Sequence, residues 1–240
     1  QPNNVKNLFR TGFTTDNSVN LAFGGKKSSF SATISDMVQD GYIPDNTYGR
    51  TSFSFGGNVQ VSDKFTIGGG FSHSTTKQVG GFFGEHQFDG ASSSFARTLF
   101  LGRAWNTSLP YEDRDTGFSV IPNSDWNDSR WSWAHDQIIS KSDRTTGNIN
   151  MNLELSDHIS ASYQLGMNKY NIHRNEIRDL GSRALFGLGG ITTDDYMNED
   201  VQSTFLVNFD YDLTEDIGLT AIVGNSLGQN TYTRKAIIAS

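Results

Sequence analysis

The sequence predicts an all-β chain whose strands form an antiparallel wall of a transmembrane β-barrel. Three observations indicate this fold class. Apolar and polar residues alternate over long stretches, these stretches exceed the usual length of soluble strands, and short turns alternate with long loops. The composition agrees, because Gly (25 residues) and Phe (17) are frequent while only 35% of the residues are hydrophobic. We therefore expect about eight strands that belong to a larger barrel.

Four hairpins account for the eight strands. The apolar members of the alternation are, in chain order, Val19, Leu21, Phe23, Phe30, Ala32 and Ile34; Phe53, Phe55, Val59, Val61, Phe65, Ile67 and Phe71; Ile149, Met151, Leu153, Leu155, Ile159, Ala161, Tyr163, Leu165 and Met167; and Phe205, Val207, Phe209, Tyr211, Leu213, Ile217, Leu219, Ala221 and Val223. Each strand is expected to span about 10 to 15 residues, which suffices to cross a bilayer at a tilt, whereas soluble strands average about 5 or 6.

The connections alternate in length. Short polar turns lie near residues 24–28, 62–65, 156–158 and 214–216, and longer connections are expected near 38–50, 77–142 and 173–199. This asymmetry is typical of outer-membrane barrels, in which short turns are periplasmic and long loops are extracellular. Both ends of the chain would then lie on the extracellular side, so we expect an interior segment of a barrel.

Composition and charge exclude several other classes. The net charge of −7 argues against a broad nucleic-acid surface. Cysteine is absent, which excludes a disulfide framework and a thiolate metal site. No run of 18 apolar residues predicts a transmembrane helix. We expect neither nucleic acid nor a cofactor as a partner.

Several short segments recur in an order and spacing that a known family shares. They are Phe9 with Thr11-Gly12, Asn17-Ser18-Val19, Gly24–Lys27, Gln39–Pro44, Arg50, Ser62–Lys64, and the later stretches LFLGRAWN, LPYED and WSWAHDQ, with Arg144 near the start of the next strand. Through these segments nearly the whole chain resembles the SusC/RagA family of TonB-linked outer-membrane proteins.

The resemblance implies a fold, a location and partners. A SusC-like protein is a 22-stranded barrel filled by an N-terminal plug and capped by a SusD-like surface lipoprotein. The pair imports oligosaccharides or peptides, and TonB supplies the energy. Residues 1–240 would be part of one such barrel domain in the outer membrane, in contact with its lipid. The plug, the TonB box and the C-terminal strands lie outside these residues, and the activity would be gated passage without catalysis.

The connection from about Lys77 to Lys141 contains all four tryptophans of the chain, Trp105, Trp126, Trp131 and Trp133. Aromatic side chains stack on sugar rings and anchor protein interfaces. One hypothesis is therefore that these residues contact the ligand or the lid protein. The alternative is that the loop packs on itself or on the barrel rim. Within the same loop, Phe95–Gly102 predicts a short helix with a structural role.

Acidic and catalytic side-chain patterns give no specific site. Asp194-Asp195 with Glu199-Asp200, and Asp125 with Asp128, are expected in loops, but their spacing matches no EF-hand. Asp113, Arg114, Asp115 and His135 follow no order that indicates an acid–base pair or a triad. We predict neither a metal site nor an enzyme.

Two other functions fit parts of the pattern: a soluble β-rich carbohydrate-binding or adhesin module, and a barrel with a structural rather than a transporting role. The direction of the apolar side chains separates a membrane wall from a soluble module. A barrel wall exposes them in a band about 25 Å tall, whereas a soluble module must bury them.

Overall fold

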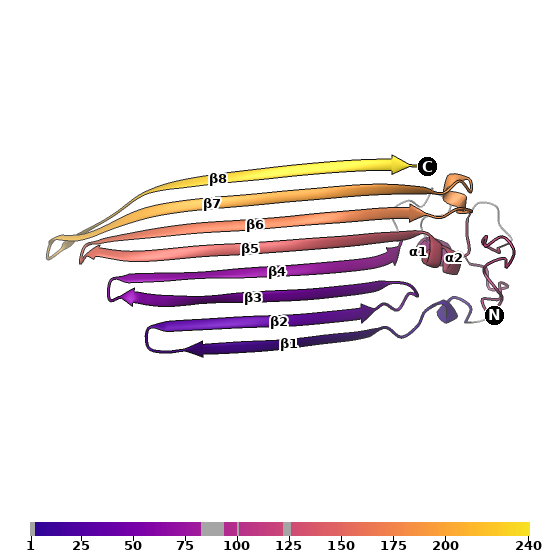
Figure 1. Cartoon of the computed structure of the whole chain (residues 1–240), viewed down its shortest axis with the longest axis horizontal. Coiled ribbons are helices and arrows are strands. Elements are labelled where there is room, and N and C mark those ends of the chain that lie inside the picture. The colour runs from indigo at the N-terminus through magenta and orange to yellow at the C-terminus, as the bar shows by residue number, and fades with distance from the viewer. Residues whose placement is uncertain (1–2, 83–93, 100, 122–125) are drawn as a thin grey trace.

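The computed structural model describes residues 3–82, 94–99, 101–121 and 126–240, and it contains one sheet of eight antiparallel strands. Each strand pairs with the next strand along the chain, so the order in space is β1 to β8 (Figure 1). Within the described residues, β1 and β8 each have a single neighbour. The predicted all-β class and the four hairpins are confirmed.

The elements have the following bounds. The strands are β1 (Phe13–Gly24), β2 (Ser28–Asp40), β3 (Thr47–Ser62), β4 (Phe65–Gly81), β5 (Gln137–Ser156), β6 (Ile159–Arg178), β7 (Gly190–Thr214) and β8 (Ile217–Ala239); the helices are η1 (Lys6–Leu8), α1 (Ser94–Leu99), α2 (Ser129–His135) and η2 (Arg183–Leu185). None of the helices described is long and apolar enough to cross a membrane.

The strands are longer than the sequence predicts, and all three of the long connections are shorter. The strands contain 12 to 25 residues, and the connection expected near 173–199 is reduced to residues 179–189. Gly80 and Gly81, at the start of the expected long loop, end β4, and the acidic residues 194–200 lie in β7 rather than in a loop. The prediction was wrong there because backbone pairing continues past the point where apolar residues stop alternating.

The register places side chains of like character opposite each other. Phe23 faces Phe30, Ile34 faces Phe53, and Ile149 faces Leu165 across neighbouring strands. Because successive side chains point to opposite faces, this register gives the sheet one apolar face and one face of Asn, Ser, Thr and Gln. A slip by one residue would exchange the two faces.

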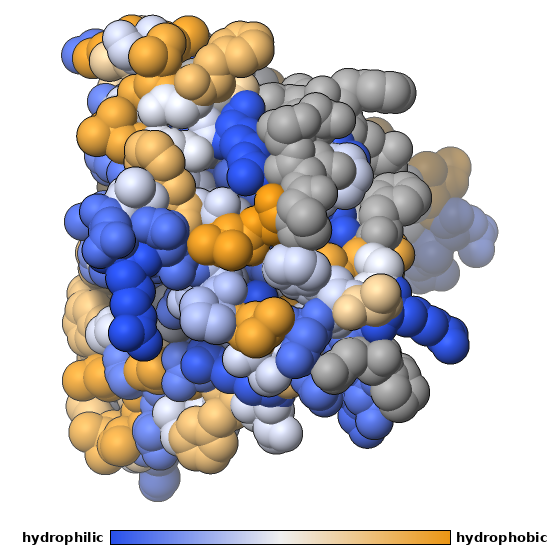
Figure 2. Space-filling view, turned by 90° about the vertical axis from the view of Figure 1, so that its right-hand side faces the viewer, coloured by the Kyte–Doolittle hydropathy of each residue, from blue (hydrophilic) through white to orange (hydrophobic). Residues whose placement is uncertain are grey.

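The apolar face is exposed rather than packed in a core. Leu21, Ile34 and Phe55 expose 61%, 59% and 51% of their surface. Seen from the loop end, hydrophobic side chains gather along the edge of the molecule away from the loops (Figure 2). The buried hydrophobic residues lie outside the strands instead: Leu8, Ile43, Phe82, Trp131 and Trp133.

All the long connections and both chain ends lie at one end of the sheet, and the four tight turns lie at the other (Figure 1). This arrangement confirms the predicted asymmetry of the connections. We call the segments that fold together at the loop end, residues 3–12, 41–46, 101–121, 126–136 and 179–189, the cap.

A strip of glycines crosses β3 and β4. Gly56 faces Gly70, Gly57 faces Gly69, and Gly68 faces Asn58. On the apolar side the strip forms part of a hollow of about 600 Å³, beside Phe55 and Phe71, whose rings stack at 5.5 Å. The neighbouring backbone lies close to this strip, since a Cβ on Gly69 would lie 2.6 Å from the Asn148 carbonyl oxygen.

We expect Gly57→Val to destabilise the sheet by about 1–3 kcal/mol or more. A Cβ at this position would collide with the Ser29 carbonyl oxygen and lie 2.8 Å from the Phe30 ring. Gly166→Ala is the matched control, because a Cβ on this strand glycine meets nothing within 4 Å. Thermal unfolding in detergent, followed by circular dichroism, measures both. Equal midpoints for the two variants would contradict the steric argument.

Candidate functional site

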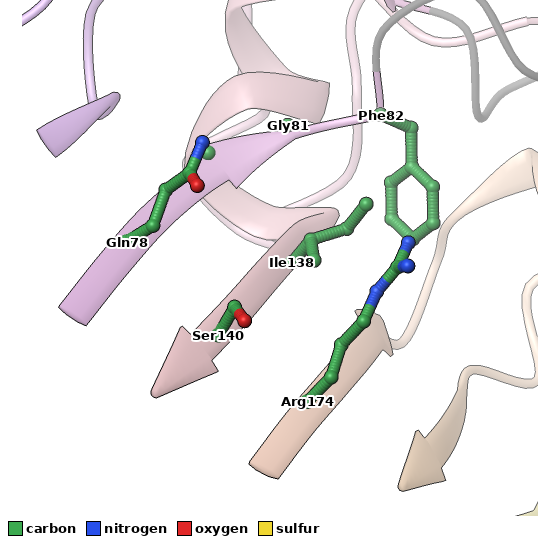
Figure 3. A pocket seen from close by; sticks show the side chains of 7 residues that line it. Gln78, Gly81, Phe82, Ile138, Ser140 and Arg174 are labelled. Carbon is green, nitrogen blue, oxygen red and sulfur yellow. The ribbon is translucent and has the colours of Figure 1, made fainter. Parts of the chain in front are cut away.

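A small cavity lies on the polar face where the sheet meets the cap. Its volume is about 270 Å³, and Gln78, Ser140 and Arg174 line it from β4, β5 and β6. These three residues form one row, because Gln78 pairs with Ser140 and Ser140 pairs with Arg174. Phe82 and Ile138 complete the lining at the cap side (Figure 3).

Arg174 provides the charge of this cavity. One terminal nitrogen lies 2.8 Å from the Glu176 carboxylate, and both side chains are partly exposed. The Nε of Arg174 is buried and has no hydrogen-bond partner. Next to it, the Arg178 guanidinium lies 4.6 Å from the centroid of the Phe82 ring. A cationic group whose donor capacity is not fully used, beside a hydroxyl, an amide and an aromatic ring, suits a carboxylate or an amide group of a ligand.

The cap is held together by a buried carboxylate. Asp136 is fully buried, and it accepts hydrogen bonds from the Ser182 hydroxyl (2.9 Å), the Asn127 amide (3.2 Å) and the Asp179 backbone N–H (3.2 Å). These bonds join the segment after Trp126 to the 179–189 loop. Burial raises the pKa of Asp136 to about 6, although the hydrogen bonds and the positive charge of Arg178 act in the opposite direction.

Helix α2 was not predicted. Its N-cap is Asp128, whose side chain accepts from the Arg130 backbone N–H at 2.9 Å and forms a two-point ion pair with the Arg130 guanidinium. The N-cap residue Asp128 is visible in the sequence, but the seven residues of the helix are too few to show a helical repeat of apolar residues. The predicted helix over Phe95–Gly102 is confirmed in part, because α1 spans Ser94–Leu99; Phe100 lies outside the described residues.

Two of the four tryptophans form the interior of the cap. Trp131 is fully buried, donates to the Gly117 carbonyl at 2.8 Å and stacks on His135 at 4.4 Å. Trp133 is 1% exposed and packs with Leu8 and Ile43. Both side chains therefore lie inside the cap.

The other two tryptophans are only partly buried. The Arg97 guanidinium lies 4.9 Å from the ring centroid of Trp126. The indole N–H of Trp105 has no hydrogen-bond partner. The role proposed for the four tryptophans, contact with the ligand or the lid protein, stays a prediction.

The candidate catalytic residues do not form a common centre. Asp113 shapes an exposed turn, in which hydrogen bonds from Thr116 and Asp115 lower its pKa. The two nitrogens of His135 face Asp179 at 2.9 Å and Glu112 at 3.4 Å. Arg114 and Asp115 are exposed on the turn that Asp113 shapes.

The acidic clusters are paired with basic side chains. Asp194 lies 2.9 Å from Arg234, Asp195 lies 2.6 Å from His173, and Glu199 lies 3.0 Å from Lys169. Asp128 pairs with Arg130, and Asp125 lies outside the described residues. Among the residues that the structure describes, no three or more His, Asp or Glu side chains are grouped to hold a metal ion.

The fold matches outer-membrane transporters of known structure. A chain of the RagAB peptide importer in the "closed-closed" state aligns over 99% of this chain with a TM-score of 0.72 and 14% identity. A chain of the RagAB peptide transporter aligns over 98% of this chain with a TM-score of 0.65 and 13% identity. BauA, the ferric preacinetobactin receptor from Acinetobacter baumannii, aligns over 94% with a TM-score of 0.52 and 11% identity. No family model and no curated protein matches the chain.

The chain spans about 30% of the length of the RagAB chains it matches. The eight strands therefore have the fold of one segment of the wall of a larger barrel, and the predicted fold class is confirmed. At 11–14% identity the likeness establishes the fold, and the activity has to be argued from the faces of the sheet and from the cap.

We expect the stability of the cap to depend on pH through Asp136. The unfolded carboxyl titrates near 3.8 and the folded one near 6, so only the folded cap keeps its proton between these values. The free energy of local unfolding should be highest below pH 3.8, fall by about 3 kcal/mol as the pH rises to about 6, and then stay constant.

Hydrogen exchange of peptides from residues 126–136, corrected for the intrinsic exchange rate at each pH, measures this effect. The Asp136→Asn variant should lose the pH dependence, because its side chain does not titrate. Asp115→Asn, in the exposed turn, is the control and should retain it. If the free energy of local unfolding in the unmodified protein does not change with pH, ionisation of Asp136 does not destabilise the cap.

Proposed function

We propose that this chain forms part of the wall and outer loops of a SusC/RagA-type, TonB-dependent importer in the outer membrane of a Gram-negative bacterium. The observation that carries the proposal is the exposed apolar face of the sheet, with Leu21, Ile34 and Phe55 more than half exposed. Such a face is stable against the lipid of a membrane, and strands of 12 to 25 residues are long enough to span a bilayer.

The asymmetry of the connections sets the orientation. The tight turns, such as those at 63–64 and 157–158, lie on the periplasmic side, and the cap lies on the extracellular side. The polar face then lines the lumen. Its Asn, Ser and Thr side chains contact water and the plug, which belongs to a region outside these residues together with the TonB box.

In this proposal, the cap and the Arg174 cavity lie where an imported molecule would enter. A SusD-like surface lipoprotein would close over the cap, and oligosaccharides or peptides would reach the lumen below it. A cavity of about 270 Å³ holds one functional group rather than a whole ligand. Arg174, Ser140 and Gln78 would thus orient a carboxylate or an amide of the passing ligand. Passage involves binding and gating without covalent chemistry.

The tryptophans take two roles in this proposal. Trp105 and Trp126, which are only partly buried, contact the lid protein or the ligand directly. Trp131 and Trp133 act from inside the cap by fixing the surface that the lid protein meets. The aromatic rings at the cap surface are suited to either partner, since they stack on sugars and anchor interfaces.

The two other candidate functions make different demands on the same structure. A soluble carbohydrate-binding or adhesin module would have to cover the apolar face with another layer. A structural barrel would share the wall and orientation but would not use the Arg174 cavity for uptake. The next two experiments separate these cases.

We expect neighbouring positions on β5 to face different surroundings. The chain has no cysteine, so single cysteines can be introduced and labelled with a fluorophore. A label on Ile149→Cys in the full-length protein, reconstituted in liposomes, should be quenched by lipid-borne nitroxide and not by aqueous iodide. Asn150→Cys should show the reverse.

Leu165→Cys and Gln164→Cys on β6 repeat the comparison on the neighbouring strand, because Ile149 pairs with Leu165 and Asn150 with Gln164. In a soluble module, neither quencher would reach the label at position 149. Quenching of that label by iodide would exclude the membrane wall.

We expect Arg174→Gln to weaken uptake of ligands that carry a carboxylate. Loss of one charge-assisted hydrogen-bonding group costs about 1.5–3 kcal/mol, which corresponds to roughly 10- to 100-fold in affinity. Arg144→Gln is the matched control, since Arg144 lies on the same polar face and does not line the cavity. Both variants are compared by measuring ligand affinity of the purified importer complex. If both lose affinity equally, the effect comes from the overall positive charge of the lumen rather than from the Arg174 cavity.

A further inference from the structure

Three side chains at the base of the cap continue the polar face of the sheet. Phe82, Asp136 and Arg178 each lie one residue beyond the last position at which β4, β5 and β6 pair with one another. Asp136 keeps an extended backbone there, with φ −92° and ψ 97°. Because successive side chains of a strand alternate between faces, the three fall on the same face as Ser140 and Arg174. The buried carboxylate of the cap therefore lies on the face that carries the Arg174 cavity.

An aromatic ring connects the cavity to this row. Phe82 is 5% exposed and lines the cavity, where its ring points toward Ile138 and Arg174 (Figure 3). The Arg178 guanidinium lies 4.6 Å from the centroid of that ring, although Arg178 itself does not line the cavity. The negative face of an aromatic ring attracts a guanidinium in this position. A second positive charge therefore lies against the wall of the cavity.

Asp136 acts on this second charge. Burial raises the pKa of Asp136 to about 6, and the positive charge of Arg178 acts in the opposite direction, so the two side chains interact electrostatically. Asp136 is fully buried, which weakens screening of the interaction by salt. The hydroxyls of Ser182 and Ser132 lie 2.9 and 3.4 Å from its carboxyl oxygen. Since a hydroxyl can donate to a carboxylate or accept from a carboxylic acid, the site accommodates both protonation states.

Protonation of Asp136 changes the charge beside the cavity. Arg174 is paired with Glu176 at 2.8 Å, and the charge of Arg178 is balanced by that of ionised Asp136. These four groups together carry no net charge when Asp136 is ionised and one positive charge when it is protonated. An anion in the cavity is therefore attracted more strongly while Asp136 holds its proton.

Other charged groups of the cap lie near Asp136 in the described residues. They are Glu112, Asp128, Arg130, His135, Asp179 and Arg183. Asp128 pairs with Arg130 at 2.8 Å, and Arg183 donates hydrogen bonds to backbone carbonyls. His135 lies 2.9 Å from Asp179 and 3.4 Å from Glu112. A histidine can also change its charge near neutral pH, so the effect of His135 has to be separated from that of Asp136.

We propose that Asp136 is a positioning residue that tunes the Arg174 cavity through Arg178, so that the cavity holds a carboxylate more tightly when Asp136 is protonated. This inference rests on the proposed function, because it describes the regulation of the same cavity. Linkage between two sites is reciprocal, so a carboxylate in the cavity and the proton on Asp136 stabilise each other. Acid outside the cell thus strengthens capture of a carboxylate.

Coulomb's law sets the size of the effect. At an effective dielectric constant of about 20 and a separation of about 10 Å, one charge changes the affinity for a carboxylate roughly tenfold. The affinity should therefore fall roughly tenfold as the pH rises from about 5 to about 8, because Asp136 loses its proton in this range.

The probe is trifluoroacetate, a strong acid that stays ionised throughout this range. Fluorine NMR titrations of the full-length protein in nanodiscs measure its affinity, and the binding that Arg174→Gln removes is assigned to the cavity. The neutral analogue trifluoroacetamide should bind equally at both ends of the pH range. If the affinity of the cavity for trifluoroacetate does not change with pH, the proposal is overturned.

A variant that gains affinity gives the sharpest test. Asp136→Asn mimics the protonated acid, so at about pH 8 it should bind trifluoroacetate roughly tenfold more tightly than the unmodified protein. A disturbed fold would lower the affinity instead. Asp115→Asn, in the exposed turn, is the matched control, and both it and His135→Gln should keep the pH dependence. No gain in Asp136→Asn, or a lost pH dependence in His135→Gln, overturns the assignment to Asp136. If Asp136→Asn does not fold, the pH profiles of the unmodified protein and of His135→Gln still decide.

A failure of the proposed function gives a different result. If Arg174→Gln leaves trifluoroacetate binding unchanged, the cavity binds no carboxylate and its proposed use in uptake is wrong. If Arg174→Gln lowers binding while the affinity of the unmodified protein is the same at every pH, only the role of Asp136 is wrong.

Discussion

Backbone pairing between neighbouring strands is the constraint on which the rest of this structure depends. Among the residues that the structure describes, no second layer covers either face of the sheet, and the buried hydrophobic side chains lie outside the strands. The strands are therefore joined by their hydrogen-bonded ladders rather than by a common core. In lipid these ladders are indispensable, because an unpaired N–H or C=O group costs several kcal/mol there. In the proposed barrel, the register that they fix decides which residues would meet the membrane and which would line the lumen.

The sequence predicted the part of the fold that local alternation encodes. The four hairpins were visible because apolar residues recur at every second position on both sides of polar turns such as Ser62–Lys64. The upper parts of β6 and β7 were assigned to a loop because apolar residues no longer recur at every second position there. His173 pairs with Asp195 in these strands through the backbone, and no hydrophobic pattern marks such pairing.

The candidate site depended on register across distant segments. Gln78 and Ser140 stand side by side although the whole 82–136 connection separates them in sequence. The burial of Trp133 likewise follows from contacts with η1 and the 41–46 loop, which no local pattern reveals.

The glycine strip between β3 and β4 has a mechanical consequence. Gly57 and Gly69 face the apolar side, Gly56, Gly68 and Gly70 face the polar side, and the wall there is little more than a single layer of peptide thick. Because the glycines themselves carry no side chains, less resists a change in the angle between β3 and β4 here than where two side chains face each other. A barrel that contains this wall would crease along the strip, so its cross-section would be oval rather than round, with its sharpest corner at Gly57 and Gly69.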